Sequence, residues 1–326
     1  MTWLVRIAVF VFVVAAWPFA AHAQNYPNRP IVMIVPFAAG GTFDIMGRIM
    51  APRMSELLGQ QIVVENTTGA GGIIGVQRVM NAAPDGYTLL LGSTGTHAYN
   101  QTIYKKRRYD AVTDFAPVTL WSEQPMVLEA RKDLAASTIP EFSALLKSNS
   151  AKMQYGSAGV GSGTHLPCAL LNIALGVDIV HVPYRGAGNA MQDLLGGRID
   201  YMCDTIQTGV EQARSGTVKG IAVMAPRRVP IIAELATTSE QGLEGVEASV
   251  WNAFFFPKGT PDSIVRQMHK AIGTMIERPD IQTRLEALGL VIVPPQQRTP
   301  EFLAEFLPKE IERWGTAIRA AGISVN

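Results

Sequence analysis

The sequence is poor in charge. Only 17% of its 326 residues are Asp, Glu, Lys or Arg, and the formal net charge is +1. A nucleic-acid-binding surface needs a concentrated basic face, and this composition does not suggest one. The one run of cations, Lys105-Lys106-Arg107-Arg108, is interpreted as a solvated surface turn. We therefore predict no nucleic acid among the partners.

Motifs that announce a catalytic, nucleotide or metal site are also missing. The sequence contains no GxxxxGK[ST] phosphate loop, no GxSxG nucleophile turn, no HExxH helix and no paired-cysteine metal motif. The glycines of residues 69–75 resemble a dinucleotide fingerprint, but Ile74 stands where its third glycine should fall. The histidines outside the N-terminal region do not have metal-ligand spacing. We predict no catalytic residue, no metal and no cofactor.

The N-terminus has the features of an export signal. Arg6 gives a weakly positive start, residues 7–16 are apolar, and Ala21-His22-Ala23 has the small-x-small form of a cleavage site. The alternative is an uncleaved anchor helix, but the apolar run is short for a membrane span of ~20 residues. We predict a signal peptide over residues 1–23, with cleavage before Gln24.

Export gives a meaning to the two cysteines. An even pair in an oxidising compartment is a candidate disulfide. Cys168 falls in the first turn of a predicted helix, and Cys203 falls in a predicted strand over residues 199–203. A helix and a neighbouring strand can meet within bridging distance. The sequence favours a Cys168–Cys203 bridge, with two separate buried thiols as the alternative.

The pattern is organised around one strand, one glycine turn and one helix. Ile31–Val35 is an apolar, β-branched run typical of a strand in a parallel sheet, and Pro36 ends it. The turn AAGG at residues 38–41 leads into a helical pattern, with Thr42 as its predicted cap. Such a unit places unpaired N–H donors at the carboxyl edge of a sheet, which is a natural anion site.

The same device occurs a second time. Residues 153–156 predict a strand, residues 157–164 form a loop of small residues, and residues 165–175 predict a helix that ends at Gly176. Two such loops, a little over a hundred residues apart, suggest two α/β lobes that face each other across a ligand.

The rest of the chain alternates strands and helices. Further strands are predicted at residues 61–65, 87–91, 179–183, 199–203, 218–224 and 250–257, and a long extended segment, interrupted at residues 122–125, is predicted at 118–131. Further helices are predicted near residues 73–80, 141–147, 187–195, 209–214, 261–277, 281–288 and 300–321. This order predicts an α/β fold of mostly parallel sheets flanked by helices. Lobe 1 is predicted at residues 24–122 and 225–326, and lobe 2 at residues 123–224.

Several motifs together resemble a known family. They include YP.RPI..IVPFAAGGT.DI..R, LGQ.IVVEN..GAGG..G, PDGYTLLLG, YGSAGVGSGTHL and HVPYRG. Over essentially the whole mature chain, this combination strongly resembles the extracytoplasmic solute receptors of tripartite tricarboxylate transporters, also called the Bordetella uptake gene (Bug) or TctC family. The resemblance implies a type II-like periplasmic-binding-protein fold, a periplasmic location, a small mono- or dicarboxylate ligand in a cleft between two lobes, and membrane transporter subunits as partners.

The resemblance also implies a binding site. In the family, two loops hold a ligand carboxylate like pincers. Carried over to this sequence, the first loop contributes Phe37, Ala38, Gly41 and Thr42, and the second contributes Ser157, Ala158, Gly161, Thr164 and His165. The rest of the cleft would be bordered by Ser93, Thr94, Tyr184 and Asp204.

Alternatives stay open at single residues. Asp44 is four residues before Arg48, so a helix ion pair is favoured over a ligand contact. His165 either contacts the ligand or fills the helix start. Asp204 either faces the cleft, where it would disfavour a second carboxylate, or is a surface residue at a strand end. Trp251 is favoured as a core residue over a stacking surface. The alternative function is an exported enzyme or a ligand-sensing subunit that uses the same cleft.

Overall fold

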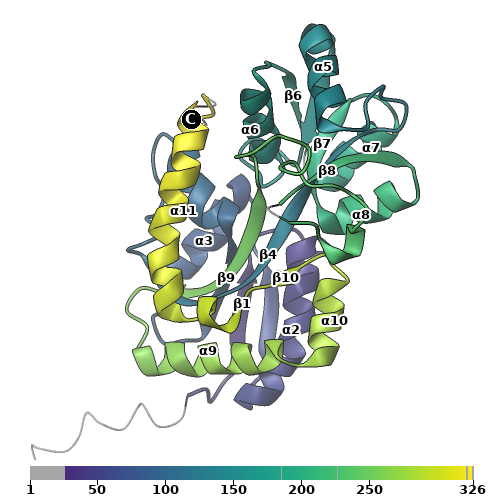
Figure 1. Ribbon diagram of the computed structural model, residues 1–326. Helices are drawn as coiled ribbons and strands as arrows, with labels where there is room; N and C mark the ends of the chain where they lie inside the picture. Colours follow the sequence, from purple (N-terminus) through teal and green to yellow (C-terminus); the bar gives the residue numbers. More distant parts are fainter. Residues whose placement is uncertain (1–25, 185, 226, 321, 325–326) are drawn as a thin grey trace, which may run out of the picture.

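The computed structural model describes residues 26–184, 186–225, 227–320 and 322–324 (Figure 1). The predicted signal peptide and its cleavage site lie outside the described residues, so both stay predictions. Among the helices of the described ranges, none combines the length and apolar character that a membrane crossing needs.

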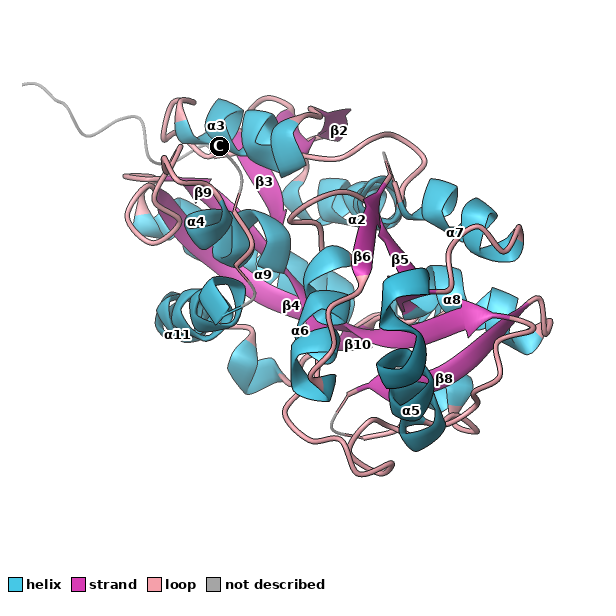
Figure 2. Ribbon diagram, turned by 90° about the horizontal axis from the view of Figure 1, so that it is seen from above, coloured by secondary structure: helices cyan, strands magenta, loops and turns pink. Residues whose placement is uncertain are grey.

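A mixed sheet of ten strands runs through the molecule (Figures 1 and 2). Its order is β2-β1-β3-β9-β4-β7-β5-β6, and β8 and β10 pair with β4 off this path. The strands are β1 (Ile31–Val35), β2 (Ile62–Asn66), β3 (Thr88–Ser93), β4 (Phe115–Arg131), β5 (Gln154–Ser157), β6 (Val180–Pro183), β7 (Tyr201–Thr205), β8 (Val218–Met224), β9 (Ser249–Pro257) and β10 (Val291–Ile292). The first three strands pair in parallel, as do β5, β6 and β7, and antiparallel pairs to β4 and β9 join the two groups.

Helices cover both faces of this sheet (Figure 2). They are α2 (Thr42–Leu58), α3 (Ile73–Met80), α4 (Asn100–Ile103), α5 (Ile139–Asn149), α6 (His165–Leu175), α7 (Ala187–Leu195), α8 (Ile206–Arg214), α9 (Asp262–Ile276), α10 (Pro279–Glu286) and α11 (Pro300–Ala320). Apolar periodicity decides which side each helix buries. In α9, Val265, Met268, Ile272 and Met275 recur at intervals of three and four residues. All four are buried in one cluster with residues of α2, β1 and β9. The predicted α/β architecture is confirmed.

Strand β4 is more continuous than predicted. The interruption expected at residues 122–125 is wrong, because this stretch pairs with residues 249–252 of β9 without a break. Irregularities in the pairing fall earlier, after Pro117 and after Leu120. The far half of β4 pairs with β7 and β8, so this strand connects the two parallel groups. The division into lobes at residues 122/123 and 224/225 stays a prediction.

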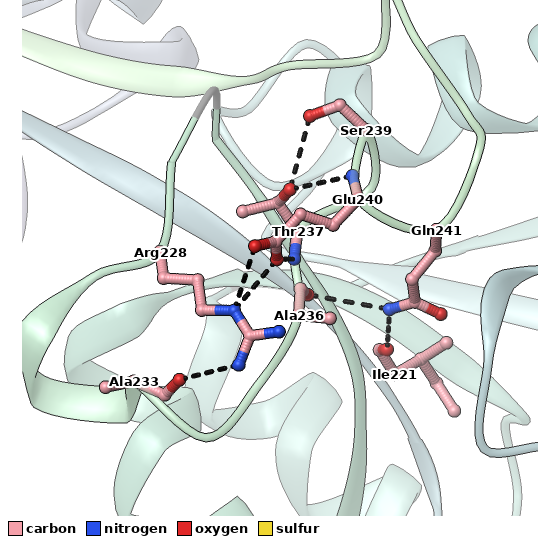
Figure 3. A network of polar contacts seen from close by, with 8 residues as sticks. All are labelled: Ile221, Arg228, Ala233, Ala236, Thr237, Ser239, Glu240 and Gln241. Atoms are coloured by element: carbon pink, nitrogen blue, oxygen red, sulfur yellow. Dashed lines mark hydrogen bonds and ion pairs between the residues drawn. The ribbon is translucent and has the colours of Figure 1, made fainter.

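A polar network fixes the connection from β8 to β9 (Figure 3). Arg228 Nε donates to Glu240 Oε2 at 2.9 Å, and the same carboxylate accepts the Thr237 N–H at 2.8 Å. Gln241 Nε2 donates to the Ile221 carbonyl of β8 at 2.9 Å. These bonds hold the long segment after β8 against the strand that it leaves.

The predicted disulfide is confirmed. Cys168 on α6 is bonded to Cys203 on β7, with Cα atoms 5.5 Å apart, and both residues are fully buried. The bond ties the helix that follows the second glycine loop to the neighbouring strand of the same group.

Candidate functional site

The carboxyl ends of both parallel strand groups point to the middle of β4. Ser93, the last residue of β3, pairs with Asn252 of β9, which in turn pairs with Ser122 of β4. Asp204, near the end of β7, pairs with Val127 of β4. Strand β3 runs in the same direction as β4, whereas β7 runs in the opposite direction. Measured along β4, the two ends therefore approach each other to within about 17 Å, at ~3.4 Å per residue.

Two loops leave these edges, and Thr94 lies between them in the sheet order. We call residues 36–41 the Pro36 loop and residues 157–164 the Ser157 loop. The Trp251 N–H donates to Thr94 Oγ1 at 2.8 Å, just after β3. A Cβ built on Gly163 of the Ser157 loop would lie 3.1 Å from the Cγ2 atom of Val250, the next residue of β9. Thr94 and the Ser157 loop thus reach adjacent residues of one strand.

The Pro36 loop is fixed at both ends. Asn66 Nδ2 donates to the Phe37 carbonyl at 3.0 Å, and the Gly40 N–H donates to Asp44 Oδ2 at 2.9 Å. Arg48 Nε donates to Asp44 Oδ1 at 2.9 Å, so the predicted ion pair is confirmed. Burial raises the pKa of Asp44, but the hydrogen bonds from Arg48 and Gly40 outweigh it and leave that pKa below its ordinary value.

Gly40 and Gly41 donate their N–H groups within the protein, and other N–H groups near the start of α2 are left for a ligand. Gly41 caps α2 through its extended backbone, with no side-chain cap, so the predicted capping role of Thr42 is wrong. Residues 38–41 are exposed. Among the described residues, the N–H groups of Ala38, Ala39 and Thr42 have no hydrogen-bond partner. The start of α2 therefore offers backbone donors, with the Asp44 carboxylate of its first turn already paired with Arg48, and such a helix N-terminus favours an anion.

The Ser157 loop uses part of its own hydrogen-bonding capacity. The Ala158 N–H donates to Thr164 Oγ1 at 2.8 Å, and the Gly161 N–H donates to His165 Nδ1 at 3.1 Å. Within the described residues, the N–H groups of Val160 and Gly163 have no partner. The predicted donors Ala158 and Gly161 are therefore engaged by side chains that belong to the same predicted site.

Two stacked imidazole rings pack against this loop. The rings of His165 and His181 are 3.9 Å apart at 19°, and Ser157 Oγ lies 2.7 Å from His181 Nε2. Burial, assisted by His181, lowers the pKa of His165 to about 3, and burial lowers that of His181 to about 4. Both rings are neutral at pH 7, so the loop carries no positive charge. His165 fills the helix start, as one alternative stated.

The other predicted residues take different positions. Ser93 and Thr94 are buried, and Tyr184 is half-buried with its Oη donating to Asp193 Oδ2 at 2.7 Å. Asp204 is fully buried, so its interpretation as a surface residue is wrong. Its Oδ1 accepts the N–H of the next residue, Thr205, at 2.7 Å.

Trp251 belongs to the core, as favoured. It is 1% exposed, and its Nε1 donates to Glu310 Oε2 at 3.0 Å. Trp314 Nε1 donates to the same carboxylate oxygen at 3.0 Å. The Glu310 carboxylate therefore links Trp251 of β9 to α11.

Sequence reasoning missed Glu129. It is fully buried in β4, diagonally across from Asp204, and neither of its carboxylate oxygens has a partner among the described residues. Burial, and then the charge of Asp204, raise its pKa well above the ordinary value of 4.5. An acid inside the apolar run MVLEA was the available signal. No group of three or more His, Cys, Asp or Glu side chains is arranged for a metal in the described part of the chain.

The whole chain is similar to solute receptors. Residues 46–323 match the model of the tripartite tricarboxylate transporter family receptor. A protein of Agrobacterium vitis, described as a UPF0065 protein in the TAR-I ttuE-ttuC' intergenic region, is 39% identical over 94% of this chain and 88% of its own length.

Solved structures agree. The periplasmic binding protein BugD has a TM-score of 0.83 at 37% identity, over 92% of this chain and 99% of its own. MatC from Rhodopseudomonas palustris, with bound malate, has a TM-score of 0.83 at 38% identity, over 90% of this chain and 100% of its own. A further R. palustris protein, solved with adipate, has a TM-score of 0.85 at 30% identity, over 92% of this chain and 99% of its own.

Proposed function

Because this chain belongs to the tripartite tricarboxylate transporter receptor family, we propose that it holds one small organic carboxylate between the Pro36 loop and the Ser157 loop. The ligand is proposed to be released to membrane subunits of that transporter class. Two finer points are also proposed: a periplasmic location, in keeping with BugD, and removal of the leader before Gln24.

The observation that supports this proposal most is the pair of uncharged loops that leave the facing carboxyl ends of the two parallel strand groups. Neither loop contains Lys or Arg, so the anion is held by amide dipoles and small hydroxyls. Hydrogen bonds to a charged group contribute ~1.5–3 kcal/mol each, and a helix N-terminus adds roughly 0.3–1 kcal/mol. Four such bonds, less the cost of ordering the ligand, reach the ~8 kcal/mol of a micromolar complex.

Binding through the N–H group of Ala158 or Gly161 requires a local exchange in the Ser157 loop. In the proposed complex, a ligand oxygen replaces Thr164 Oγ1 as acceptor for Ala158, or His165 Nδ1 as acceptor for Gly161. Because one acceptor replaces another, the exchange leaves no buried donor unpaired. The loop is therefore held in shape without ligand, and the cost of the exchange is the one acceptor, Thr164 Oγ1 or His165 Nδ1, that loses its donor.

The proposed ligand class is a dicarboxylate or a carboxylate with a polar tail. MatC holds malate and the second R. palustris protein holds adipate, which makes these acids the first probes. Asp204 lies fully buried near the end of β7. If the distal end of the ligand reaches Asp204, its carboxylate favours a hydroxyl, amine or amide there over a second carboxylate.

The test is a thermal-shift screen of carboxylates, followed by recovery of the bound compound. We expect concentration-dependent stabilisation by at least one acid, with the acid recovered unchanged. Conversion of the compound would instead indicate an exported enzyme. Stabilisation by no carboxylate would refute the proposal.

A glycine variant locates the ligand. Gly161 has φ +75°, and its Cβ would lie 2.8 Å from Ile103 Cδ1, so Gly161→Ala displaces the Ser157 loop. We expect about tenfold weaker binding, the equivalent of ~1.4 kcal/mol. Gly176→Ala is the matched control, because φ is +67° there and nothing lies within 4 Å. Equal effects of the two variants on affinity would place the ligand elsewhere.

A further inference from the structure

Four consecutive cations follow α4, and the site does not use them. Lys105, Lys106, Arg107 and Arg108 are all exposed, and we call them the basic cluster. The whole chain has a formal net charge of only +1, so this is a strong local concentration of positive charge. A solvated surface turn accounts for the exposure of the basic cluster, but it does not account for the position of the cluster next to the site.

The basic cluster begins beside the Ser157 loop and next to a turn that contacts the Pro36 loop. Ile103, the last residue of α4, is the side chain that a Cβ on Gly161 would meet at 2.8 Å. The next residue, Tyr104, donates its hydroxyl to the Ala70 carbonyl at 3.2 Å. Two residues further along that turn, a Cβ on Gly72 would lie 3.5 Å from Phe37 Cζ of the Pro36 loop. The end of α4 thus has the Ser157 loop on one side and the surroundings of the Pro36 loop on the other.

The backbone of the basic cluster is held in place. Arg107 Nε donates to the Gln101 carbonyl at 3.2 Å, and Gln77 Nε2 donates to the Arg108 carbonyl at 3.2 Å. Arg107 Nη1 lies 3.8 Å from Asp110 Oδ2. These contacts give the cluster of four cations a fixed location.

We propose that the basic cluster guides the anionic ligand towards the two loops and speeds its association. The proposal rests on the proposed function, because it assumes that the ligand is an anion bound there. In this proposal, uncharged amides contact the carboxylate, and the cations attract it from a distance without contacting it. Cations that do not contact the bound ligand accelerate its association without slowing its dissociation, which suits a receptor that must release its ligand.

The expected effect follows from Coulomb's law with screening. Backbone reach places the four cations at roughly 15 Å from a dianion between the loops. At 10 mM ionic strength the Debye length is about 30 Å, and the attraction accelerates association roughly tenfold. At physiological ionic strength the Debye length is about 8 Å, and the gain falls to less than about twofold.

The test compares two variants with the same change of charge. The first is Lys105→Gln, Lys106→Gln, Arg107→Gln and Arg108→Gln together. The matched control is Lys147→Gln, Lys152→Gln, Lys270→Gln and Arg284→Gln, at exposed positions on or next to α5, α9 and α10. Association and dissociation rates of malate and adipate are measured by stopped-flow tryptophan fluorescence from 10 to 500 mM salt.

We expect the cluster variant to associate about tenfold more slowly than the parent at 10 mM salt, with dissociation unchanged within twofold. Its association rate should depend little on salt, whereas the control should keep the salt dependence of the parent. Equal association rates of cluster variant and parent at low salt would overturn the proposal, as would an equal effect of the control. A parent that binds neither acid, nor any other carboxylate of the screen, would overturn the proposed function and this inference with it. Faster dissociation as the main effect would show that the cations contact the ligand and would overturn the guiding role.

Discussion

Glu129 should make this protein less stable as the pH rises. Its carboxyl group is fully buried, neither oxygen has a partner among the described residues, and Asp204 lies across the same strand pair. A Cβ on Gly209 of α8 would lie 2.0 Å from Glu129 Oε1, so the helix backbone closes this position. An ionised carboxylate cannot be accommodated there without large cost, so the folded protein keeps the group protonated.

The sign and the size follow from linkage. Burial and Asp204 raise the pKa of Glu129 well above 4.5, its ordinary value. Between those two pKa values the folded state binds a proton that the unfolded state has lost. The free energy of unfolding therefore falls by about 1.4 kcal/mol for each pH unit between 4.5 and the raised pKa. Over the interval from 4.5 to 7 the loss is at most about 3 kcal/mol.

Glu129→Gln tests this reasoning, because glutamine has the same shape and does not ionise. We expect the variant to be more stable than the parent at pH 7, by up to about 3 kcal/mol, and nearly equal to it at pH 4, measured by urea unfolding at each pH. Glu305→Gln, at an exposed position on α11, is the control and should change stability little at either pH. A Glu129→Gln variant that is less stable at pH 7, or a difference independent of pH, would refute the argument.

Two further predictions concern the group of strands around the Ser157 loop. Replacing Cys168 and Cys203 by serine should lower the free energy of unfolding by about 3–4 kcal/mol, because the bond closes a loop of 35 residues; a thiol assay on the unreduced, unfolded parent should find no free thiol. The pKa of His165 is about 3 and that of His181 about 4, so the folded state resists protonation, and stability should fall as the pH drops from 6.5 towards 4. Replacing both histidines by glutamine should flatten this acid limb in urea unfolding, and an unchanged slope would contradict the assignment.

The local sequence pattern predicted the bounds of those helices and strands whose limits depend on their own residues. The bounds predicted for α6, α7 and β8 are confirmed, because apolar periodicity and flanking glycines mark them in the sequence itself. The expected break in β4 at residues 122–125 was wrong for the opposite reason. Ser, Glu, Gln and Pro have low strand preference alone, but pairing with β9 holds them extended.

The site shows the same division. Small residues after a buried strand predicted two amide-rich loops, and that part needs only neighbouring residues. The engagement of Ala158 and Gly161 by Thr164 and His165 could not be predicted, because it depends on the path of the loop in space. Nor could the burial of Asp204, whose surroundings come from the strands and helix packed around it.

By itself, the sequence determined the order of strands and helices, the two glycine loops and the pair of cysteines that can bridge. These depend on residues close together along the chain. Only the tertiary structure decided that β9 and β4 join the two strand groups, and that α4, which leads into the surface cations, ends beside the Ser157 loop. Such contacts arise from strand pairing between residues more than a hundred positions apart. The local sequence does not indicate which distant segment will be the partner.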